Sequence, residues 1–277
     1  MNNSNIKDDR IKPFLRWAGS KRQLLPILSE FWNDSYHCYI EPFAGSAALF
    51  FYLSPQKAIL ADINSELIMT YYQIKTNLPH VLEALSLLKK SKSRYYYLRS
   101  LEPNSLSAPF RAARFIYLNR FCFNGLYRTN RRGKFNVPYG GDRTGNIPSA
   151  ESLRQCSKKL SKVRILKSSF EITLKYAKEG DFVYIDPPFK VSSRRVFNEY
   201  DAVSFDSSSL IKLREWLIAI NKKNISFLVS YADSDEARYL SGGFYSIKVS
   251  ARRNISGFIG SRKIDNELLI YNKHTEI

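Results

Sequence analysis

The sequence of 277 residues predicts an α/β protein built on a doubly wound sheet. Short apolar segments typical of buried strands run into acidic residues at Glu41, Asp62 and Asp186. Helical patterns alternate with these strands, but the alternation lapses after about residue 71 and resumes near residue 160. We therefore expect a sheet domain made of residues 11–70 and 160–277, with a mainly helical domain inserted at 71–159.

The composition is that of a basic, metal-free protein. The chain carries 43 Lys and Arg residues against 25 Asp and Glu, a formal net charge of +18. Such an excess favours a polyanionic partner, although solubility or attraction to a membrane surface would also account for it. The few cysteines and histidines are dispersed, which indicates neither a metal site nor a disulfide framework and fits a reducing cytoplasm. No apolar run approaches the roughly 18 residues of a membrane span.

A loop of small residues precedes the first expected helix, which spans residues 23–31. Ala18, Gly19 and Ser20 would let the backbone approach a ligand closely, with Trp17 and Lys21 on either side. A helix-capping turn with a buried tryptophan is the alternative.

The first strand–turn–helix unit starts with a strand at residues 39–40 and turns at 42–46. The turn lacks the GxGxxG pattern of a pyrophosphate cradle, and Glu41 would repel phosphate, so a cationic or neutral ligand suits it. The next strand ends at Asp62, about 20 residues after the turn, where doubly wound folds place a carboxylate on a ribose hydroxyl. Asp62 could instead cap the helix that begins near Asn64.

The inserted segment contains a predicted β-hairpin at about residues 119–141. Asn124-Gly125 and Arg132-Gly133 are turn signals, and basic residues alternate with aromatic ones along the segment. A basic ribbon of this kind could enter a DNA groove, with arginine reading guanine. A solvated hairpin on a basic protein is the alternative, but the interleaved aromatic residues favour nucleic acid.

Further elements follow from the hydrophobic periodicity. We expect helices at 78–88, 110–118, 170–177 and 208–220, and strands at 163–166, 182–185, 225–229, 244–249 and 267–271.

The strand at 182–185 delivers Asp186 onto a rigid turn made by Pro187 and Pro188. Phe189 then offers a flat apolar face beside the carboxylate, and a polar loop is expected at 190–205. This stretch could hold a planar group that bears an NH2. It could equally be a strand that stops at a surface turn, and these residues alone do not decide between the two.

Several sequence blocks occur together in a fixed order. They are FLRWAGSK (14–21), EPFAGS (41–46), NGLYR (124–128), FNVP (135–138) and DPPF (186–189). With these blocks the chain, from about residue 13 to 272, resembles the Dam-type DNA adenine-N6 methyltransferases, the alpha-ordered or D12 class. The resemblance implies a parallel-centred, seven-stranded S-adenosylmethionine-dependent methyltransferase sheet, an inserted target-recognition domain, double-stranded DNA as substrate and a monomeric enzyme.

The same resemblance implies roles for individual residues. Cofactor contacts fall on Trp17, Lys21, Asp62 and Asp186, with Phe43, Ala44 and Gly45 beside the methionine end of the cofactor. DNA contacts fall on Arg16, Phe123, Asn124, Leu126, Arg128 and Pro138, with Arg16 reading guanine, Phe123 filling the opened base stack and Asn124 contacting phosphate. The catalytic motif is Asp186, Pro187, Pro188 and Phe189, acting on N6 of a flipped-out adenine, with GATC as the expected site.

A few positions depart from the family pattern. Phe189 replaces a usual tyrosine, Ser169 a frequent aspartate, Gly141 a frequent basic residue and Tyr231 a common asparagine. These changes bear on the target sequence and the cofactor affinity more than on the reaction class. The alternatives are an amino-methyltransferase acting on cytosine N4 or on RNA, and a non-catalytic DNA-binding regulator that retains the fold.

Overall fold

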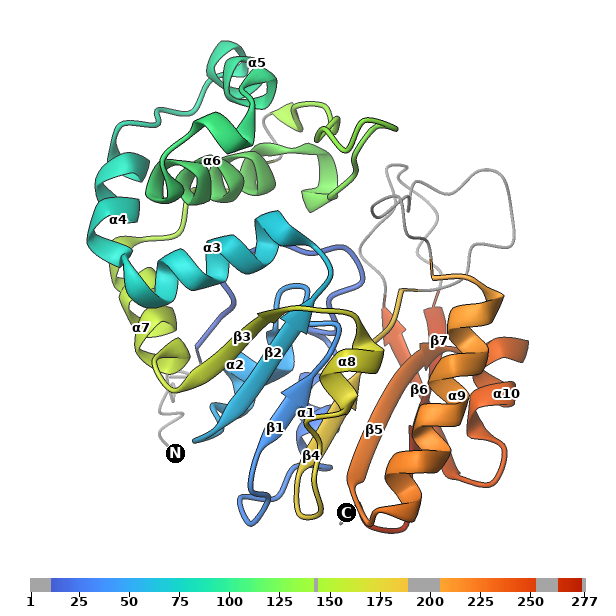
Figure 1. Cartoon of the computed structure of the whole chain (residues 1–277). Coiled ribbons are helices and arrows are strands. Elements are labelled where there is room, and N and C mark those ends of the chain that lie inside the picture. Colours follow the sequence, from blue (N-terminus) through green and yellow to red (C-terminus); the bar gives the residue numbers. More distant parts are fainter. Residues whose placement is uncertain (1–10, 142–143, 189–204, 253–263, 276–277) are drawn as a thin grey trace, which may run out of the picture.

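The computed structural model describes residues 11–141, 144–188, 205–252 and 264–275, and shows a mixed α/β fold (Figure 1). Phe189 and residues 190–204 lie outside the described residues. The ring expected beside Asp186 and the loop expected after it therefore stay predictions. Within the described part of the chain, no helix has the length and apolar character needed to cross a membrane.

A seven-stranded sheet forms the centre of the molecule, in the order β3-β2-β1-β4-β5-β7-β6. Its strands are β1 (Tyr39–Glu41), β2 (Ala58–Asp62), β3 (Val163–Lys167), β4 (Phe182–Ile185), β5 (Ser226–Ala232), β6 (Tyr245–Arg252) and β7 (Ile264–Tyr271). The strands from β3 to β5 in this order run parallel, whereas β7 is antiparallel to both β5 and β6. The predicted α/β class and doubly wound sheet are confirmed.

The winding of the sheet reverses between β1 and β4. From β1 the chain moves outward through β2 to β3, and it later returns to place β4 against the other side of β1. Open α/β sheets bind their ligands at such a reversal, beyond the carboxyl ends of the strands. Glu41 is the last residue of β1 and Asp186 the first after β4, so both carboxyl groups stand at this point.

Alternate residues of β4 belong to different hydrophobic cores. Phe182 and Tyr184 join the core that contains Phe50, whereas Val183 joins a second core with Leu213. This division follows from the two-residue repeat of a strand, whose side chains point alternately to the two faces of the sheet. Because β4 is covered on both faces, its sequence is a continuous apolar run.

Helices cover both faces of the sheet (Figure 1). One face packs against α8 (Phe170–Leu174), α9 (Ser207–Lys222) and α10 (Asp235–Ser241). The other core takes residues from α1 (Leu25–Ser29), α2 (Ala48–Leu53), α3 (Ser65–Thr76), α4 (Leu78–Ser86), α5 (Lys92–Ser100), α6 (Ala108–Phe121) and α7 (Ala150–Leu160). The helix predicted at 170–177 is shorter than expected, because turns carry the chain from Leu174 to Gly180, whose φ is +83°.

The inserted segment shares its hydrophobic core with the sheet. Tyr71 on α3, Phe115 on α6 and Leu153 on α7 all belong to the core that contains Phe50. Helix α3 also runs without a break across the expected boundary at residue 70. The division into two domains stays a prediction. Helix α7, which was not predicted, has a buried side formed by Leu153, Cys156 and Leu160.

The predicted hairpin takes the form of a loop at residues 121–140, after the end of α6, and not that of a continuous two-stranded ribbon. Its arms pair through isolated antiparallel bridges, Cys122 with Tyr139 and Thr129 with Phe135. Asn124 and Gly125 both have positive φ, 54° and 67°, which turns the first arm away from its partner. This turn divides the loop into two short paired segments. We call this segment the 121–140 loop.

Candidate functional site

Asp186 is fixed at the carboxyl end of β4 by groups from two other elements. The Ser230 hydroxyl on β5 donates to Asp186 Oδ1 over 3.2 Å, and Lys21 Nζ lies 3.1 Å from the same oxygen. The Asp186 side chain keeps 21% of its exposure, and the adjacent Pro187 is buried. The carboxylate is therefore held in one position while part of it faces outward.

Lys21 lies between two carboxylates. Its Nζ is 3.1 Å from Asp186 Oδ1 and 3.3 Å from Oε1 of Glu267, which β7 contributes. The side chains of Lys21 and Glu267 are only 6% and 4% exposed. Buried charges of this kind persist because they pair with one another. Glu267 and Ser230 were not among the predicted site residues.

Asp62 organises the turn that follows β1. One of its carboxylate oxygens accepts the N–H of Gly45 over 3.1 Å, and the other accepts the N–H of Asn64 over 3.0 Å. Asp62 does not cap α3, because Asn64 does so by accepting the N–H of Leu67. The alternative reading of Asp62 as a helix cap is wrong. The residue joins the loop after β2 to the turn after β1.

Gly45 allows Trp17 to approach the turn closely. A Cβ atom at Gly45 would lie 2.7 Å from Cδ1 of the Trp17 ring, and the φ of Gly45 is +47°. The carbonyl of Gly45 accepts the buried hydroxyl of Tyr71 over 2.9 Å. Trp17, Lys21, Gly45 and Asp62 therefore gather around the carboxyl ends of β1, β2 and β4. Of the two other turn residues predicted here, Phe43 stacks on Phe170 in the core on the α8 side, and Ala44 is buried.

Glu41 is a buried carboxyl group in the same place. Burial raises its pKa well above the usual value, the nearby Asp186 and Asp62 raise it further, and the Tyr39 hydroxyl opposes the rise by donating a hydrogen bond over 2.9 Å. Glu41 therefore keeps its proton to a higher pH than an exposed glutamate does.

Several of the predicted DNA-contacting residues lie together on the 121–140 loop and the segment before Trp17. Gly125 lies against Arg16: a Cβ atom added at Gly125 would lie 2.8 Å from the Cβ atom of Arg16. Phe123, 44% exposed, donates its backbone N–H to the carbonyl of Pro138. Asn124 and Pro138 are exposed, whereas Arg16, Leu126 and Arg128 are half-buried. Arg128 sits further along the loop, where its Nε donates to Asn136 Oδ1 over 2.8 Å.

The base of this loop carries closely spaced positive charges. Burial lowers the pKa values of Arg22 and Arg120, and the nearby Arg16 lowers both further. Arg22 donates to the carbonyl of Leu15, and Arg120 to that of Asn146. Backbone carbonyls thus hold the two guanidinium groups without neutralising their charge, which favours an anionic partner at this surface.

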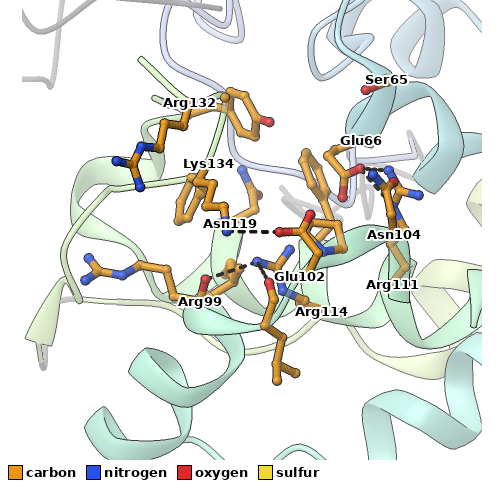
Figure 2. Close-up of a pocket in the computed structure, with 17 residues that line it drawn as sticks. Ser65, Glu66, Arg99, Glu102, Asn104, Arg111, Arg114, Asn119, Arg132 and Lys134 are labelled. Carbon is orange, nitrogen blue, oxygen red and sulfur yellow. Dashed lines mark hydrogen bonds and ion pairs between the residues drawn. The ribbon is translucent and has the colours of Figure 1, made fainter. Parts of the chain in front are cut away.

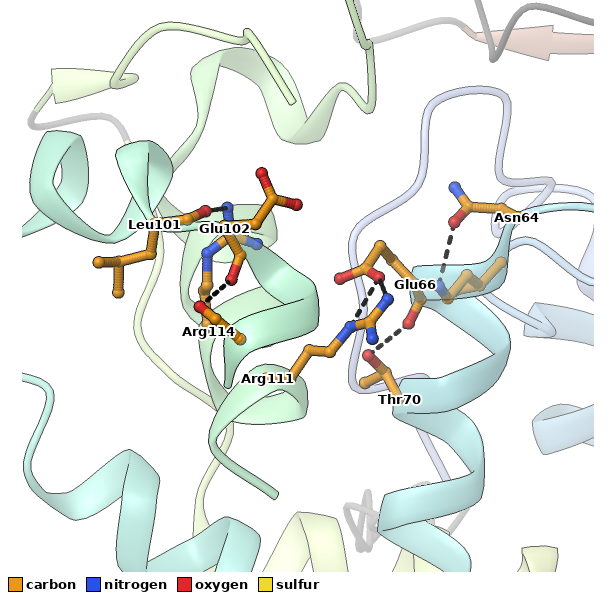
Figure 3. Close-up of polar contacts among 9 residues, drawn as sticks. Asn64, Glu66, Thr70, Leu101, Glu102, Arg111 and Arg114 are labelled. Carbon is orange, nitrogen blue, oxygen red and sulfur yellow. Dashed lines mark hydrogen bonds and ion pairs between the residues drawn. The ribbon is translucent and has the colours of Figure 1, made fainter. Parts of the chain in front are cut away.

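A cavity of about 370 Å³ lies beside this region, between the first turn of α3 and the 121–140 loop (Figure 2). Part of its charged lining is paired: Arg111 bonds to Glu66, and Lys134 Nζ lies 3.0 Å from Glu102. Arg114 donates to three backbone carbonyls, among them that of Leu101 (Figure 3). We place the candidate site at Asp186 and not in this cavity. Here the ion pair of Glu66 with Arg111 joins α3 to α6, and that of Glu102 with Lys134 holds the 121–140 loop.

Among the described residues, no group of three or more His, Cys, Asp and Glu side chains could hold a metal ion.

Comparisons with known proteins agree on one family. A family model described as D12 class N6 adenine-specific DNA methyltransferase matches residues 17–255. The type II methyltransferase M1.LlaDCHI of Lactococcus lactis subsp. cremoris is 36% identical over 271 residues, which cover 95% of each chain. M.MjaIII of Methanocaldococcus jannaschii, also a type II methyltransferase, is 35% identical over 95% of this chain and 99% of its own. The DNA adenine methylase of Escherichia coli K12 is 34% identical over 93% of this chain and 94% of its own.

Proposed function

Because the chain belongs to the D12 class N6 adenine-specific DNA methyltransferases, we propose that it methylates a flipped-out adenine in duplex DNA, with S-adenosylmethionine as the methyl donor. We further propose GATC or a related sequence as its target. The position of Asp186 at the reversal of the sheet carries the proposal, because ligands of such sheets bind at that edge.

The residues around this edge suit S-adenosylmethionine. The Gly45 turn, the carboxylate of Asp62 and the small-residue loop beside Trp17 provide close backbone approach and an acceptor for ribose hydroxyls. Glu41 and Asp186 suit the positive charge of such a ligand. The bound cofactor supplies a sulfonium methyl group for transfer to a nucleophile. Phe43 and Ala44 extend the same turn, and we expect the methionine end beside them.

Asp186 would activate the adenine amino group. That nitrogen is a poor nucleophile, because its lone pair is delocalised into the ring. Hydrogen bonds from the amino group to the Asp186 carboxylate and to a backbone carbonyl near Pro187 would favour a tetrahedral nitrogen. The carboxylate also stabilises the positive charge that develops on this nitrogen during transfer. Lys21 and Ser230 bond to Oδ1 and so fix the carboxylate before the reaction.

The 121–140 loop would open and read the DNA. Flipping a base costs a few kcal/mol in lost stacking and pairing, which an inserted aromatic ring offsets in part. Phe123 is exposed and suited to fill the gap, and we propose that Phe189 stacks on the flipped adenine. Asn124 would contact phosphate, with Arg16, Leu126, Arg128 and Pro138 at base edges.

The variant Asp186→Ala tests this function. We expect it to lose methyl transfer by at least about a thousandfold while DNA binding stays within a few-fold of wild type. Asp235→Ala is the matched control, because Asp235 is fully exposed on α10. Mass analysis of nucleosides from treated DNA reports the product. N4-methylcytosine without N6-methyladenine, methylation of RNA alone, or wild-type turnover by Asp186→Ala would each overturn the proposal.

A further inference from the structure

We propose that Asn119 is a positioning residue that determines target specificity. Its side-chain amide fixes the backbone of Arg16 and so decides which base edge the Arg16 side chain reaches. This inference rests on the proposed function, because it takes Arg16 as the residue that reads guanine. Asn119 was not among the predicted site residues.

The Asn119 amide pairs with Arg16 as a neighbouring strand would. Arg16 donates its backbone N–H to Asn119 Oδ1 over 2.8 Å, and Asn119 Nδ2 donates to the carbonyl of Arg16 over 2.6 Å. Two opposed residues of an antiparallel sheet exchange the same pair of bonds. Asn119 is only 3% exposed, and hydrogen bonds are stronger away from water. Together the two bonds fix the direction in which the Arg16 side chain leaves the backbone.

Asn119 stands on a rigid element that leads into the 121–140 loop. It lies in the last turn of α6, and the neighbouring Leu118 and Phe121 belong to the main hydrophobic core. On the other side of the contact, Arg16 precedes Trp17, whose ring fills the space over Gly45. The amide therefore joins the base of the 121–140 loop to the segment that covers the turn after β1.

The 121–140 loop confines the Arg16 side chain as well. A Cβ atom added at Gly125 would lie 3.2 Å from Nε of Arg16, in addition to its close approach to Cβ. The Nη1 atom of Arg16 donates to the carbonyl of Arg120 over 3.5 Å. An arginine that reads guanine aligns two donors of its planar guanidinium with O6 and N7 of one base. A shift of the Arg16 backbone would misalign these donors and weaken the discrimination between bases.

The variant Asn119→Leu tests the proposal, because leucine is close to asparagine in shape but makes neither bond. The target is first read from the methylome of cells that express the wild type, and kcat/KM is then measured on duplexes changed at one base pair at a time. We expect discrimination to fall about tenfold at one guanine of the target and to stay near wild type elsewhere. Arg16→Ala should relax the same position, and the double variant should relax it no further than Arg16→Ala alone.

The matched control is Asn272→Leu, the same change at another buried amide. Asn272 is 1% exposed, donates to the carbonyl of Ile225 over 2.8 Å and accepts the N–H of Phe227. These bonds lie at the start of β5, at the sheet edge opposite Asp186. Asn272→Leu should lose stability and keep the discrimination of the wild type. Unchanged discrimination in Asn119→Leu, or relaxation spread over all positions of the target, would overturn the inference.

A second variant carries the test should Asn119→Leu fail to fold. Gly125→Ala keeps the amide but presses on Arg16 from the loop, and it should relax the same guanine position. Gly243→Ala controls for strain, because Gly243 has a φ of +78° and no atom within 4 Å of the added Cβ, and it should keep the discrimination of the wild type. Unchanged discrimination in Gly125→Ala would contradict the inference. A wild type that methylates no adenine would refute the proposed function instead, so the two failures are distinguishable.

Discussion

Trp17 stacks on Tyr127, with ring centroids 5.7 Å apart and ring planes 18° from parallel. Trp17 also fills the space over Gly45 on the turn after β1, and Tyr127 packs against Phe115 and Phe135. The two rings therefore connect the candidate cofactor site with the 121–140 loop through direct contact.

Tyr127→Ala should weaken both the packing of the 121–140 loop and the candidate cofactor site. Loss of this buried ring is expected to lower the free energy of unfolding by about 3 kcal/mol and, because Trp17 loses its stacking partner, to reduce cofactor affinity several-fold. Tyr127→Phe keeps the ring and should remain near wild type. Urea unfolding and calorimetric titration with the cofactor measure the two effects. Wild-type cofactor affinity in folded Tyr127→Ala would show that Trp17 does not need the stack.

Gly45→Ala should remove cofactor binding with a modest effect on stability. The added methyl group would meet the Trp17 ring at 2.7 Å, and a positive φ costs a residue with a side chain roughly 1–2 kcal/mol. The matched control is Gly243→Ala, which has a φ of +78° but no atom within 4 Å of the added Cβ. Both variants should lose stability, and only Gly45→Ala should lose cofactor affinity. Equal affinity in the two variants would contradict the close approach of Trp17.

The ion pair of Glu66 and Arg111 should contribute strongly to stability. It joins α3 to α6 and is largely buried, with side-chain exposures of 13% and 22% (Figure 3). Arg111→Met alone leaves a buried carboxylate without its partner, which we expect to cost about 3 kcal/mol. The double variant Glu66→Gln, Arg111→Met should recover much of that loss in urea unfolding. Additive losses in the double variant would show that the two groups act independently.

Glu41 should make the stability of the free protein depend on pH. Its pKa is raised by burial above the ordinary value of 4.5, so the folded protein binds this proton more tightly than the unfolded chain. The resulting stability is fully present below pH 4.5 and is lost as pH rises towards the raised pKa. Glu41→Gln, which still accepts from Tyr39, should be more stable than wild type at pH 7 and lose this dependence. Parallel stability curves from pH 4 to 8 would argue against a buried proton on Glu41.

The site residues at the ends of the parallel strands could be predicted from the sequence, because local patterns determine where these strands end. An apolar run that ends in an acid places Asp62 or Asp186 at a sheet edge, whatever the rest of the chain does. Glu267 could not be found in this way, because its place depends on an antiparallel pairing between segments distant in sequence. The buried side of α7 includes Cys156 between two leucines, a weak apolar signal. The sequence indicated a turn at Asn124-Gly125, but it did not indicate that the positive φ values of these two residues divide the ribbon.

Because isolated bridges hold the 121–140 loop, its sequence can change more freely than that of the sheet. The loop is anchored at its base, where the amide of Asn119 bonds to both the N–H and the carbonyl of Arg16. Beyond this anchor, no continuous ladder fixes a register that each substitution would have to preserve. Exposed positions between the bridges can therefore be exchanged while the strands that end at Asp62 and Asp186 keep their places, so the proposed reading surface and the proposed reaction centre can evolve at different rates.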